Sequence, residues 1–362
     1  MKSHFIHVET VRLSHQHYVG KIILNNSKSL NALNDNMIAK LKHCLTVWHN
    51  DKSIVMVWIE SAIDKAFCAG GDIRGLYHKI KEEKHDDIAH FFAVEYELDY
   101  LIHTFNKPIV VWGNGIVMGG GLGLMAGGSH RVVTENSLLA MPEMNIGLFP
   151  DVGATWFLNQ VPHHLGLVIA WMAYQLDHYD ALYAHLAEHY IHHSDKNKVF
   201  MYLDKIKWSD NVEVNHRQLT EYMQQYALPY ERSLLETYSD KLISLIQDDN
   251  MLVVYDNLLS YHFTEQKWKL GQEVMKKGSP LTARIIWHQF TECTQDTLTQ
   301  CFAKELHWVK NVCRYGDVLE GIRALLIDKD KQPHWKFGHL SEVEEMFISD
   351  KILSKMPEIL YT

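Results

Sequence analysis

The sequence predicts an α/β fold with a helical C-terminal extension, and three observations support this prediction. Up to about residue 188, β-rich runs alternate with helical patterns, which is typical of an α/β core. A buried strand beginning at Pro108 runs into three glycines and then a helix. From about residue 195 onward, strand signals fade and amphipathic helices dominate. We therefore expect a core over residues 1–195 and a mainly helical region over 196–362 that packs on it.

The first predicted elements are a hairpin and a helix. Residues 5–25 hold two β-rich runs around a polar turn, which indicates a hairpin. Residues 31–49 then carry apolar side chains at spacings of four, four, four and three, which form one helical stripe. Asn34 lies at the start of this stripe and is its expected N-cap.

The next elements repeat the alternation of strand and helix. A buried strand at 53–61 leads into a glycine-containing turn at 66–73, and a helix follows over about 86–105. After the glycine run, a further strand is expected at 130–143, and the region 153–188 looks helical. The amphipathic helices of the second half are expected at 216–226, 231–248 and 296–312.

The composition narrows the class of protein. The 362 residues are 47% hydrophobic and carry a net charge of -9, so a large core fits and nucleic acid is not an expected partner. The odd number of cysteines, five, with no CxxC pair, argues against a disulfide framework or a zinc site. No apolar run is long enough for a membrane helix, and the N-terminus lacks signal or transit features. These features predict a cytoplasmic protein without membrane partners.

Gly119–Gly121 is the first candidate functional feature. A strand that ends in glycines before a helix brings bare backbone N–H groups close to a ligand, and the helix N-terminus adds unpaired donors. Such a site suits a phosphate or a developing oxyanion. The alternative is a tight strand–helix packing turn, and the run does not match GxGxxG or a Walker A sequence.

A second glycine-containing turn lies in "AFCAGGD", residues 66–72. Together with the first, it would supply backbone donors from two separate strand ends, as an oxyanion hole requires. Cys68 could instead be a thiol nucleophile, but no partnered base is evident, and a small buried cysteine is more often inert packing.

Glu143 and Asp151 lie eight residues apart in the apolar stretch "MPEMNIGLFPD". Carboxylates among Met, Ile, Leu and Phe are costly unless they have a partner or a task. In one pocket, one could act as base or nucleophile while the other positions a proton. The structural alternatives are that Glu143 caps a loop and that Asp151 N-caps the following helix.

One short stretch of the sequence matches a metal-binding pattern. Residues 185–189, "HLAEH", match H-x-x-E-H, which would place His185 and His189 on one helical face. The surrounding residues are typical of an ordinary amphipathic helix in a chain rich in histidine. No metal site is therefore predicted.

Taken together, "AFCAGGDI", "NGIVMGGGLGL" and "AMPEMNIGLFPDVGA" resemble the crotonase (enoyl-CoA hydratase/isomerase) superfamily, and more narrowly its 3-hydroxyisobutyryl-CoA hydrolase branch. The similarity extends over nearly the whole chain, including 316–335. The resemblance implies a spiral of ββα units and an oxyanion hole made of the backbone N–H groups of Gly120 and of Cys68 or a neighbour. It also implies that the backbone of Cys68, Ala69, Gly70 and Gly71 holds coenzyme A.

The catalytic positions separate the branches of this superfamily. Hydratases use two glutamates, of which the first would fall at Gly123 and the second at Glu143. Where hydratases commonly have glycine, this chain has Asp151. Glu95 matches a position that the hydrolase branch uses near the substrate, where it could hydrogen-bond an acyl hydroxyl; its alternative is a solvated helix glutamate.

The resemblance implies hydrolysis of a branched hydroxyacyl-CoA, with 3-hydroxyisobutyryl-CoA as the expected substrate, in valine breakdown and without a separate cofactor. Glu143 would attack the thioester or activate water, and Asp151 would orient that water and move a proton. The rival functions are an enoyl-CoA hydratase or isomerase and a non-catalytic acyl-CoA-binding protein. The resemblance also leaves a homo-oligomer open, because hydratase relatives form trimers and hexamers.

Overall fold

The computed structural model describes residues 5–13 and 17–354, and most of the expected hairpin turn falls outside them. The chain forms two compact units, each made of three segments. Unit 1 comprises Met1–Gly71, Glu97–Leu139 and Leu176–Thr237. Unit 2 comprises Asp72–Tyr96, Ala140–Gln175 and Tyr238–Thr362. The division into a core and a C-terminal region at residue 195 stays a prediction.

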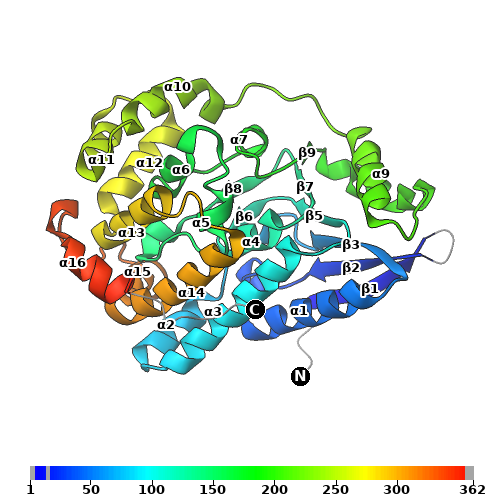
Figure 1. Cartoon of the computed structure of the whole chain (residues 1–362), viewed down its shortest axis with the longest axis horizontal. Coiled ribbons are helices and arrows are strands. Elements are labelled where there is room, and N and C mark those ends of the chain that lie inside the picture. Colours follow the sequence, from blue (N-terminus) through cyan, green and yellow to red (C-terminus); the bar gives the residue numbers. More distant parts are fainter. Residues whose placement is uncertain (1–4, 14–16, 355–362) are drawn as a thin grey trace. The chain divides into compact units, whose positions relative to one another are not determined.

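Unit 1 is built on a six-stranded sheet (Figure 1). Its strands, in spatial order, are β1 (Ile6–Arg12), β2 (Tyr18–Leu24), β3 (Ile54–Ser61), β5 (Ile109–Gly113), β7 (His130–Val133) and β9 (His189–Tyr190). The first two form the predicted antiparallel hairpin, and the remaining pairs are parallel. Every residue of β3 is buried, as its continuous apolar run requires of a central parallel strand.

A second, three-stranded sheet contains β4 (Ala66–Cys68), β6 (Ile116–Met118) and β8 (Leu138–Ala140). The single strands expected from about 108 and over 130–143 are therefore wrong: each region is two short strands that belong to different sheets. The chain passes from the first sheet to the second three times, and a helix follows the first two passages. Gly115, with φ +73°, makes one such passage, where a Cβ would lie 2.4 Å from the carbonyl oxygen of Lys65.

The helices of unit 1 include α1 (Asp35–Asn50), α4 (Gly120–Ala126), α7 (His178–Tyr183), α8 (Lys196–Met201) and α9 (Val212–Gln224). The expected N-cap is confirmed, because the Asn34 side chain accepts a 3.0 Å hydrogen bond from the Met37 amide. Helices α3 (His85–His103) and α10 (Leu234–Ile246) each contain a boundary between the units.

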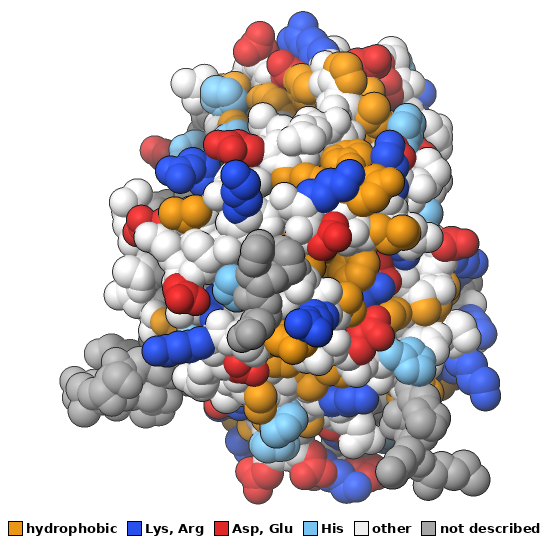
Figure 2. All heavy atoms as spheres, turned by 90° about the vertical axis from the view of Figure 1, so that its right-hand side faces the viewer, with side chains coloured by type: hydrophobic (Ala, Val, Ile, Leu, Met, Phe, Trp, Pro, Cys, Tyr) orange, Lys and Arg blue, Asp and Glu red, His pale blue; other side chains and the backbone are white. Residues whose placement is uncertain are grey.

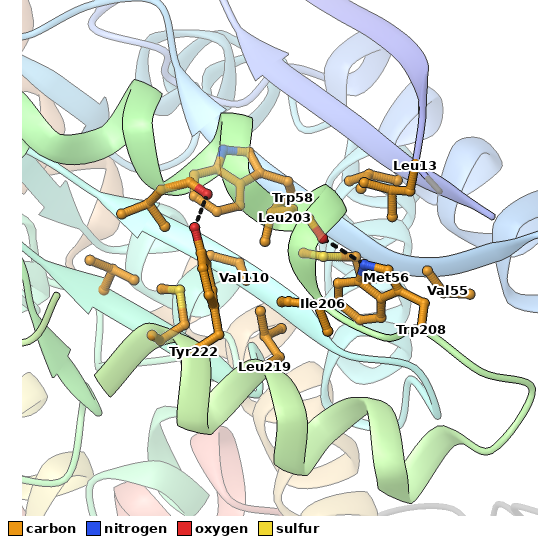
Figure 3. Packing of buried hydrophobic residues seen from close by; sticks show 14 of the residues in the cluster. Leu13, Val55, Met56, Trp58, Val110, Leu203, Ile206, Trp208, Leu219 and Tyr222 are labelled. Atoms are coloured by element: carbon orange, nitrogen blue, oxygen red, sulfur yellow. Dashed lines mark hydrogen bonds between the residues drawn. The ribbon is translucent and has the colours of Figure 1, made fainter. Parts of the chain in front are cut away.

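Figure 3 shows how α9 and the segment before it cover one face of the large sheet. Trp58 of β3 stacks on Trp112 of β5, with ring centroids 5.6 Å apart, inside a cluster of buried apolar side chains. Two polar groups in this cluster are paired: Tyr222 donates to the Val199 carbonyl and the Trp208 indole to the Leu203 carbonyl. The core of unit 1 thus includes residues from beyond position 195.

Unit 2 is mainly helical. Its helices include α2 (Ile73–Lys81), α5 (Ala154–Phe157), α6 (Gly166–Trp171), α11 (Met251–Ser260), α12 (Gln266–Lys277), α13 (Pro280–Thr291), α14 (Leu298–Tyr315), α15 (Val318–Ile322) and α16 (Glu345–Phe347). Within it, α13 packs on α6, α14 on α5, and α15 on α2. From residue 196 to 354 the described chain contains helices and loops but no strand, and the predicted helices correspond to α9, α10 and α14.

The region 153–188 differs from the expected helical run. It contains the short helices α5, α6 and α7 and one 3-10 helix, η4 (Pro162–His164), and the backbone has positive φ at His163, His164 and Ala173. The interruptions allow the chain to turn between short pieces. Among the described residues, none of the helices is long and apolar enough to cross a membrane. On the face shown in Figure 2, acidic and basic side chains are interspersed, with hydrophobic side chains between them.

Candidate active site

In unit 1, the two glycine-containing turns lie against each other. A Cβ placed on Gly70 would lie 3.8 Å from the amide nitrogen of Gly120, and one on Gly121 would lie 2.3 Å from the carbonyl oxygen of Cys68. The turns therefore touch backbone to backbone, which side chains at these positions would prevent. The structure thus brings the predicted oxyanion-hole residues Gly120 and Cys68 together.

Gly120 is the first residue of α4, and Gly119 precedes it with φ +50°. An N–H group in the first turn of a helix has no partner within that helix. The glycine run therefore presents backbone donors at the point where the two turns meet. Gly123 is buried in the same helix, so the position of the first hydratase glutamate offers no carboxylate here.

The 68–71 turn is held by the segment before α1. The Ala69 amide donates to the Leu30 carbonyl at 3.0 Å, and the Leu33 amide donates to the Gly70 carbonyl at 2.8 Å. A parallel bridge joins Leu33 to Gly71. Since the Ala69 amide is engaged in this way, the neighbouring amides of the turn are the better candidates for a second oxyanion donor.

Cys68 itself is fully buried, and its thiol lies 3.1 Å from the carbonyl oxygen of Asn31. A small, fully buried thiol usually behaves as an apolar packing group. The contact with a carbonyl favours that interpretation over a thiol nucleophile. Any part that Cys68 takes in the site would therefore come from its backbone.

In unit 2, the predicted carboxylates Glu143 and Asp151 are both buried, with exposed fractions of 5% and 4%. Glu143 opens the 3-10 helix η3 (Glu143–Ile146) directly after Pro142. Its Oε2 atom is buried without a hydrogen-bond partner among the residues that the structure describes. A buried carboxyl oxygen with no partner is costly, which makes Glu143 a candidate functional group.

Asp151 is paired with a residue that the sequence had not suggested. The hydroxyl of Tyr96, on α3, donates a 2.6 Å hydrogen bond to Oδ2 of Asp151. The position of Tyr96 is fixed by its ring contacts with Phe92 and Phe302. A charge-assisted bond of this kind orients the Asp151 carboxylate and favours its ionised form.

Glu95 precedes Tyr96 on α3 and is 3% exposed. The alternative of a solvated helix glutamate is therefore wrong, because this face of α3 is buried. The charge of Glu95 raises the pKa of Glu143, which places the two carboxyl groups in one electrostatic environment. The structure thus brings Glu95, Glu143 and Asp151 into one buried cluster.

The expected helix-cap role of Asp151 is also not observed. Helix α5 begins at Ala154, and its N-cap is Gly153, which has no side chain that could bond the first turn. Instead, Glu305 of α14 accepts hydrogen bonds from the amides of Gly153, at 2.7 Å, and Thr155, at 2.8 Å. The Asp151 carboxylate accepts a hydrogen bond from Tyr96 instead of capping the helix.

Tyr96 and Glu305 are the site residues that sequence reasoning missed. A signal for Glu305 existed in the pattern of α14, where Cys301, Glu305 and Val309 are four residues apart and all buried. A glutamate in the buried stripe of an amphipathic helix needs a polar partner. The partner itself lies about 150 residues away and could not be read from the pattern.

Burial raises the pKa values of three carboxyl groups in unit 2, those of Glu143, Asp151 and Glu305. It raises the pKa of Glu143 well above its ordinary value, with the Asp151 charge adding to the effect. It raises the pKa of Asp151 to about 6, although the Tyr96 hydrogen bond lowers it. It raises the pKa of Glu305 to about 8, against the hydrogen bonds from Thr155 and Gly153. Asp151 therefore ionises more easily than Glu143.

The H-x-x-E-H pattern does not lie on a helix. Helix α7 ends at Tyr183, His185 has φ 57°, and His189 belongs to the edge strand β9. The expectation of an ordinary amphipathic helix through this stretch is therefore wrong, because residues 189–190 pair with β7 instead.

Comparison with known proteins assigns the chain to a class. Residues 19–352 match the family model described as enoyl-CoA hydratase/isomerase. The chain belongs to this family. It is 36% identical over 342 residues to 3-hydroxyisobutyryl-CoA hydrolase, mitochondrial, of Danio rerio, which covers 94% of this chain and 88% of the relative. It is 35% identical to the Homo sapiens protein of the same name, covering 95% of this chain and 89% of the relative.

Solved structures support the same assignment. The fold is similar to that of an enoyl-CoA hydratase from Rhodobacter sphaeroides, with a TM-score of 0.82, 26% identity, and coverage of 95% of this chain and 96% of that one. A carnitinyl-CoA dehydratase from Mycobacterium thermoresistibile gives a TM-score of 0.82 at 26% identity, covering 96% and 98%. The predicted crotonase-like α/β fold and the resemblance to the hydrolase branch are confirmed.

The predicted cytoplasmic location is wrong on this comparison. The similar hydrolases from Danio rerio, Homo sapiens and Mus musculus are all named as mitochondrial proteins. The prediction depended on the residues at the start of the chain and on cysteine usage, and neither feature fixes the compartment in which a folded enzyme of this family works.

Proposed function

We propose that the protein hydrolyses a short branched hydroxyacyl-CoA thioester, with 3-hydroxyisobutyryl-CoA as the substrate, to 3-hydroxyisobutyrate and free coenzyme A. The relatives named as 3-hydroxyisobutyryl-CoA hydrolases support this substrate. The observation that carries the proposal is the position of the Asp151 carboxylate. It accepts a hydrogen bond from the Tyr96 hydroxyl and does not cap helix α5. The reaction places the enzyme in valine breakdown.

In unit 1, the backbone N–H of Gly120 and an amide at or beside Cys68 would bind the thioester oxygen as it gains negative charge. Such donors act where charge develops in the transition state, and losing one typically costs about 10²–10³ in rate. The backbone of residues 68–71 would hold the coenzyme A portion. The close packing of the two turns supports this role, because it fixes the donors before substrate arrives.

In unit 2, the carboxylates would supply the proton chemistry. In one route, Glu143 attacks the thioester carbonyl, the C–S bond breaks, and the thiolate leaves and is protonated, which gives a mixed anhydride that water then hydrolyses. In the other route, Glu143 takes a proton from water as the water attacks. Asp151 orients the water and moves a proton in either route, and Glu95 would hydrogen-bond the acyl hydroxyl.

A labelling experiment separates these routes. A single turnover in ¹⁸O-labelled water, with enzyme in excess, places label in the Glu143 side chain if Glu143 attacks and water then hydrolyses the anhydride at the Glu143 carbonyl carbon, because that carbon keeps the solvent oxygen. Label in the product acid alone fits base catalysis, and also an anhydride that water attacks at the acyl carbon, so label in Glu143 is the decisive result. Peptide mass spectrometry of the region around Glu143 gives the result.

A thiol-release assay across a panel of acyl-CoA esters tests the function. We expect the highest kcat/KM with 3-hydroxyisobutyryl-CoA and lower values with unbranched esters or esters without the hydroxyl. Hydration of crotonyl-CoA without thiol release would support an enoyl-CoA hydratase, the function of one solved structural relative. The absence of a carboxylate at Gly123 disfavours that outcome. Tight binding of every ester without release of thiol would indicate an acyl-CoA-binding protein.

A further inference from the structure

Helix α5 has only four residues, and the backbone that enters it is unusual. Val152 has φ 55° and Gly153 has φ 88°, so two successive residues adopt the left-handed conformation directly after Asp151. This conformation is unfavourable for a β-branched residue such as valine. It persists only where surrounding groups determine it, and such segments gather at functional sites.

Two side chains from later helices hold this segment. Both oxygens of Glu305, on α14, are occupied: Oε2 accepts from the Gly153 amide and Oε1 from the Thr155 amide. Gln289, on α13, donates at 2.7 Å to the Pro150 carbonyl and at 2.7 Å to the Thr155 hydroxyl. The backbone on either side of Asp151 is thus fixed by the part of the chain that follows residue 280.

Glu305 takes the capping role at the start of α5 that an aspartate in the position of Asp151 usually has. An aspartate just before a helix usually bonds the amides of the first turn through its own side chain. Here the Asp151 backbone carbonyl accepts from the Ala154 amide, while the amides of Gly153 and Thr155 are already satisfied by Glu305. The Asp151 carboxylate turns instead to Tyr96.

We propose that Glu305 is a positioning residue for Asp151: by capping α5 from a separate helix, it keeps the Asp151 carboxylate on the Tyr96 hydroxyl and available for proton transfer. The inference rests on the proposed function of Asp151. This role would account for the presence of a fully buried glutamate, with an exposed fraction of 0%, in the apolar stripe of α14. The charged or titratable groups that face Glu305 are Asp151, Tyr96 and Cys301.

The test compares Glu305→Gln with the wild type and with Glu273→Gln. Glutamine has one acceptor oxygen, so it satisfies one of the two amides and leaves the other for Asp151. Glu273 lies at the surface of α12 and pairs with Lys276 and Lys277, so it controls for loss of a carboxylate. We expect kcat for thiol release to fall up to about 100-fold in Glu305→Gln, the scale of a small misplacement, with KM little changed. Glu273→Gln should match the wild type.

A double-mutant cycle distinguishes positioning from a merely structural role. If Glu305 acts through Asp151, then Glu305→Gln combined with Asp151→Asn should be no slower than Asp151→Asn alone. A crystal structure of Glu305→Gln should show the Asp151 carboxylate turned from Tyr96 toward the first turn of α5. The proposal would be overturned if the losses in kcat from the two substitutions multiplied in the double variant. It would also be overturned if Glu305→Gln kept wild-type kcat and its structure showed the Asp151 carboxylate still on Tyr96.

Two further observations keep the outcomes distinct. If Glu305→Gln does not fold, Glu305→Asp retains the carboxyl group on a shorter side chain, and the same cycle and structure are measured with it. If the wild type itself releases no thiol from any ester of the panel, the proposed function fails. In that case the orientation of Asp151 in the variant structure still decides whether Glu305 controls it.

Discussion

The hydroxyl of Tyr96 donates a 2.6 Å hydrogen bond to Oδ2 of Asp151, and both groups are buried. The two residues lie 55 positions apart in the chain, one on α3 and the other in the loop that leads to α5. Asp151 ionises more easily than Glu143, because burial raises its pKa only to about 6 and the Tyr96 hydrogen bond lowers it, while the pKa of Glu143 is raised well above its ordinary value.

Tyr96→Phe should move the acidic limb of the pH profile of kcat/KM to higher pH. The hydroxyl lowers the pKa of Asp151, so its removal raises that pKa and delays ionisation as pH rises. A shift of one unit corresponds to about a tenfold loss below the limb and little loss well above it. Tyr100→Phe, on the same helix with a 37% exposed side chain, is the matched control. An equal loss at every pH would show that Tyr96 acts by packing alone.

Glu143→Gln should abolish thiol release while the protein stays folded. The substitution keeps the shape of the side chain and removes its acid–base and nucleophilic function. Because Oε2 of Glu143 is buried without a partner among the described residues, the neutral amide should leave the midpoint of thermal unfolding unchanged or raised at pH 8. Turnover near that of the wild type would remove Glu143 from the mechanism.

Asp151→Asn should be severely impaired and should retain its bond to the Tyr96 hydroxyl, since the amide oxygen can still accept. We expect kcat to fall by about 10²–10⁴, the usual contribution of a positioned acid or base. Thiol release at saturating 3-hydroxyisobutyryl-CoA measures the loss. An active variant would mean that Asp151 serves the loop and not the reaction.

The contributions of Asp151 and Glu305 to the free energy of unfolding should decrease as pH rises from about 4 to 8. The folded state raises the pKa of Asp151 from 3.8 to about 6 and that of Glu305 from 4.5 to about 8, so it keeps protons that the unfolded chain has released. The stabilisation from protonated Asp151 is complete below about pH 4 and is lost as pH passes 6; its upper value is on the order of 3 kcal/mol.

Urea titrations at a series of pH values measure this dependence. Relative to the wild type, Asp151→Asn should lose the decrease contributed between about pH 4 and 6, and Glu305→Gln the decrease that extends up to about pH 8, because each removes one of the retained protons. Identical slopes in the wild type and both variants would contradict the assignment of these protons.

Gly121→Ala should reduce both stability and thiol release. The added Cβ would lie 2.3 Å from the Cys68 carbonyl oxygen, so the two turns that carry the proposed oxyanion donors must separate. We expect a loss of about 10²–10³ in kcat, as for loss of one donor. Gly338→Ala is the control, since its nearest neighbour would be a Glu342 carboxylate oxygen at 3.4 Å. Unchanged kcat in Gly121→Ala would argue against an oxyanion hole at this junction.

The sequence by itself determined the local elements. Alternation and a continuous apolar run predicted the hairpin and β3, and four-residue spacing with Asn34 as cap predicted α1. Two glycine runs and the combination of Glu143, Gly123 and Asp151 predicted the chemistry of the site. These features depend on backbone geometry and residue type over short stretches, which a sequence displays directly.

Only the tertiary structure decided where the chain changes from one sheet to the other, and which groups face the carboxylates. Whether a run such as 130–143 is one strand or two depends on its neighbours in space. The local pattern allows Asp151 to be a helix cap, but in the structure Glu305 accepts from the amides at the start of α5 and the Asp151 carboxylate accepts from the Tyr96 hydroxyl. Burial by such distant partners sets the pKa of a carboxyl group, and no local pattern contains them.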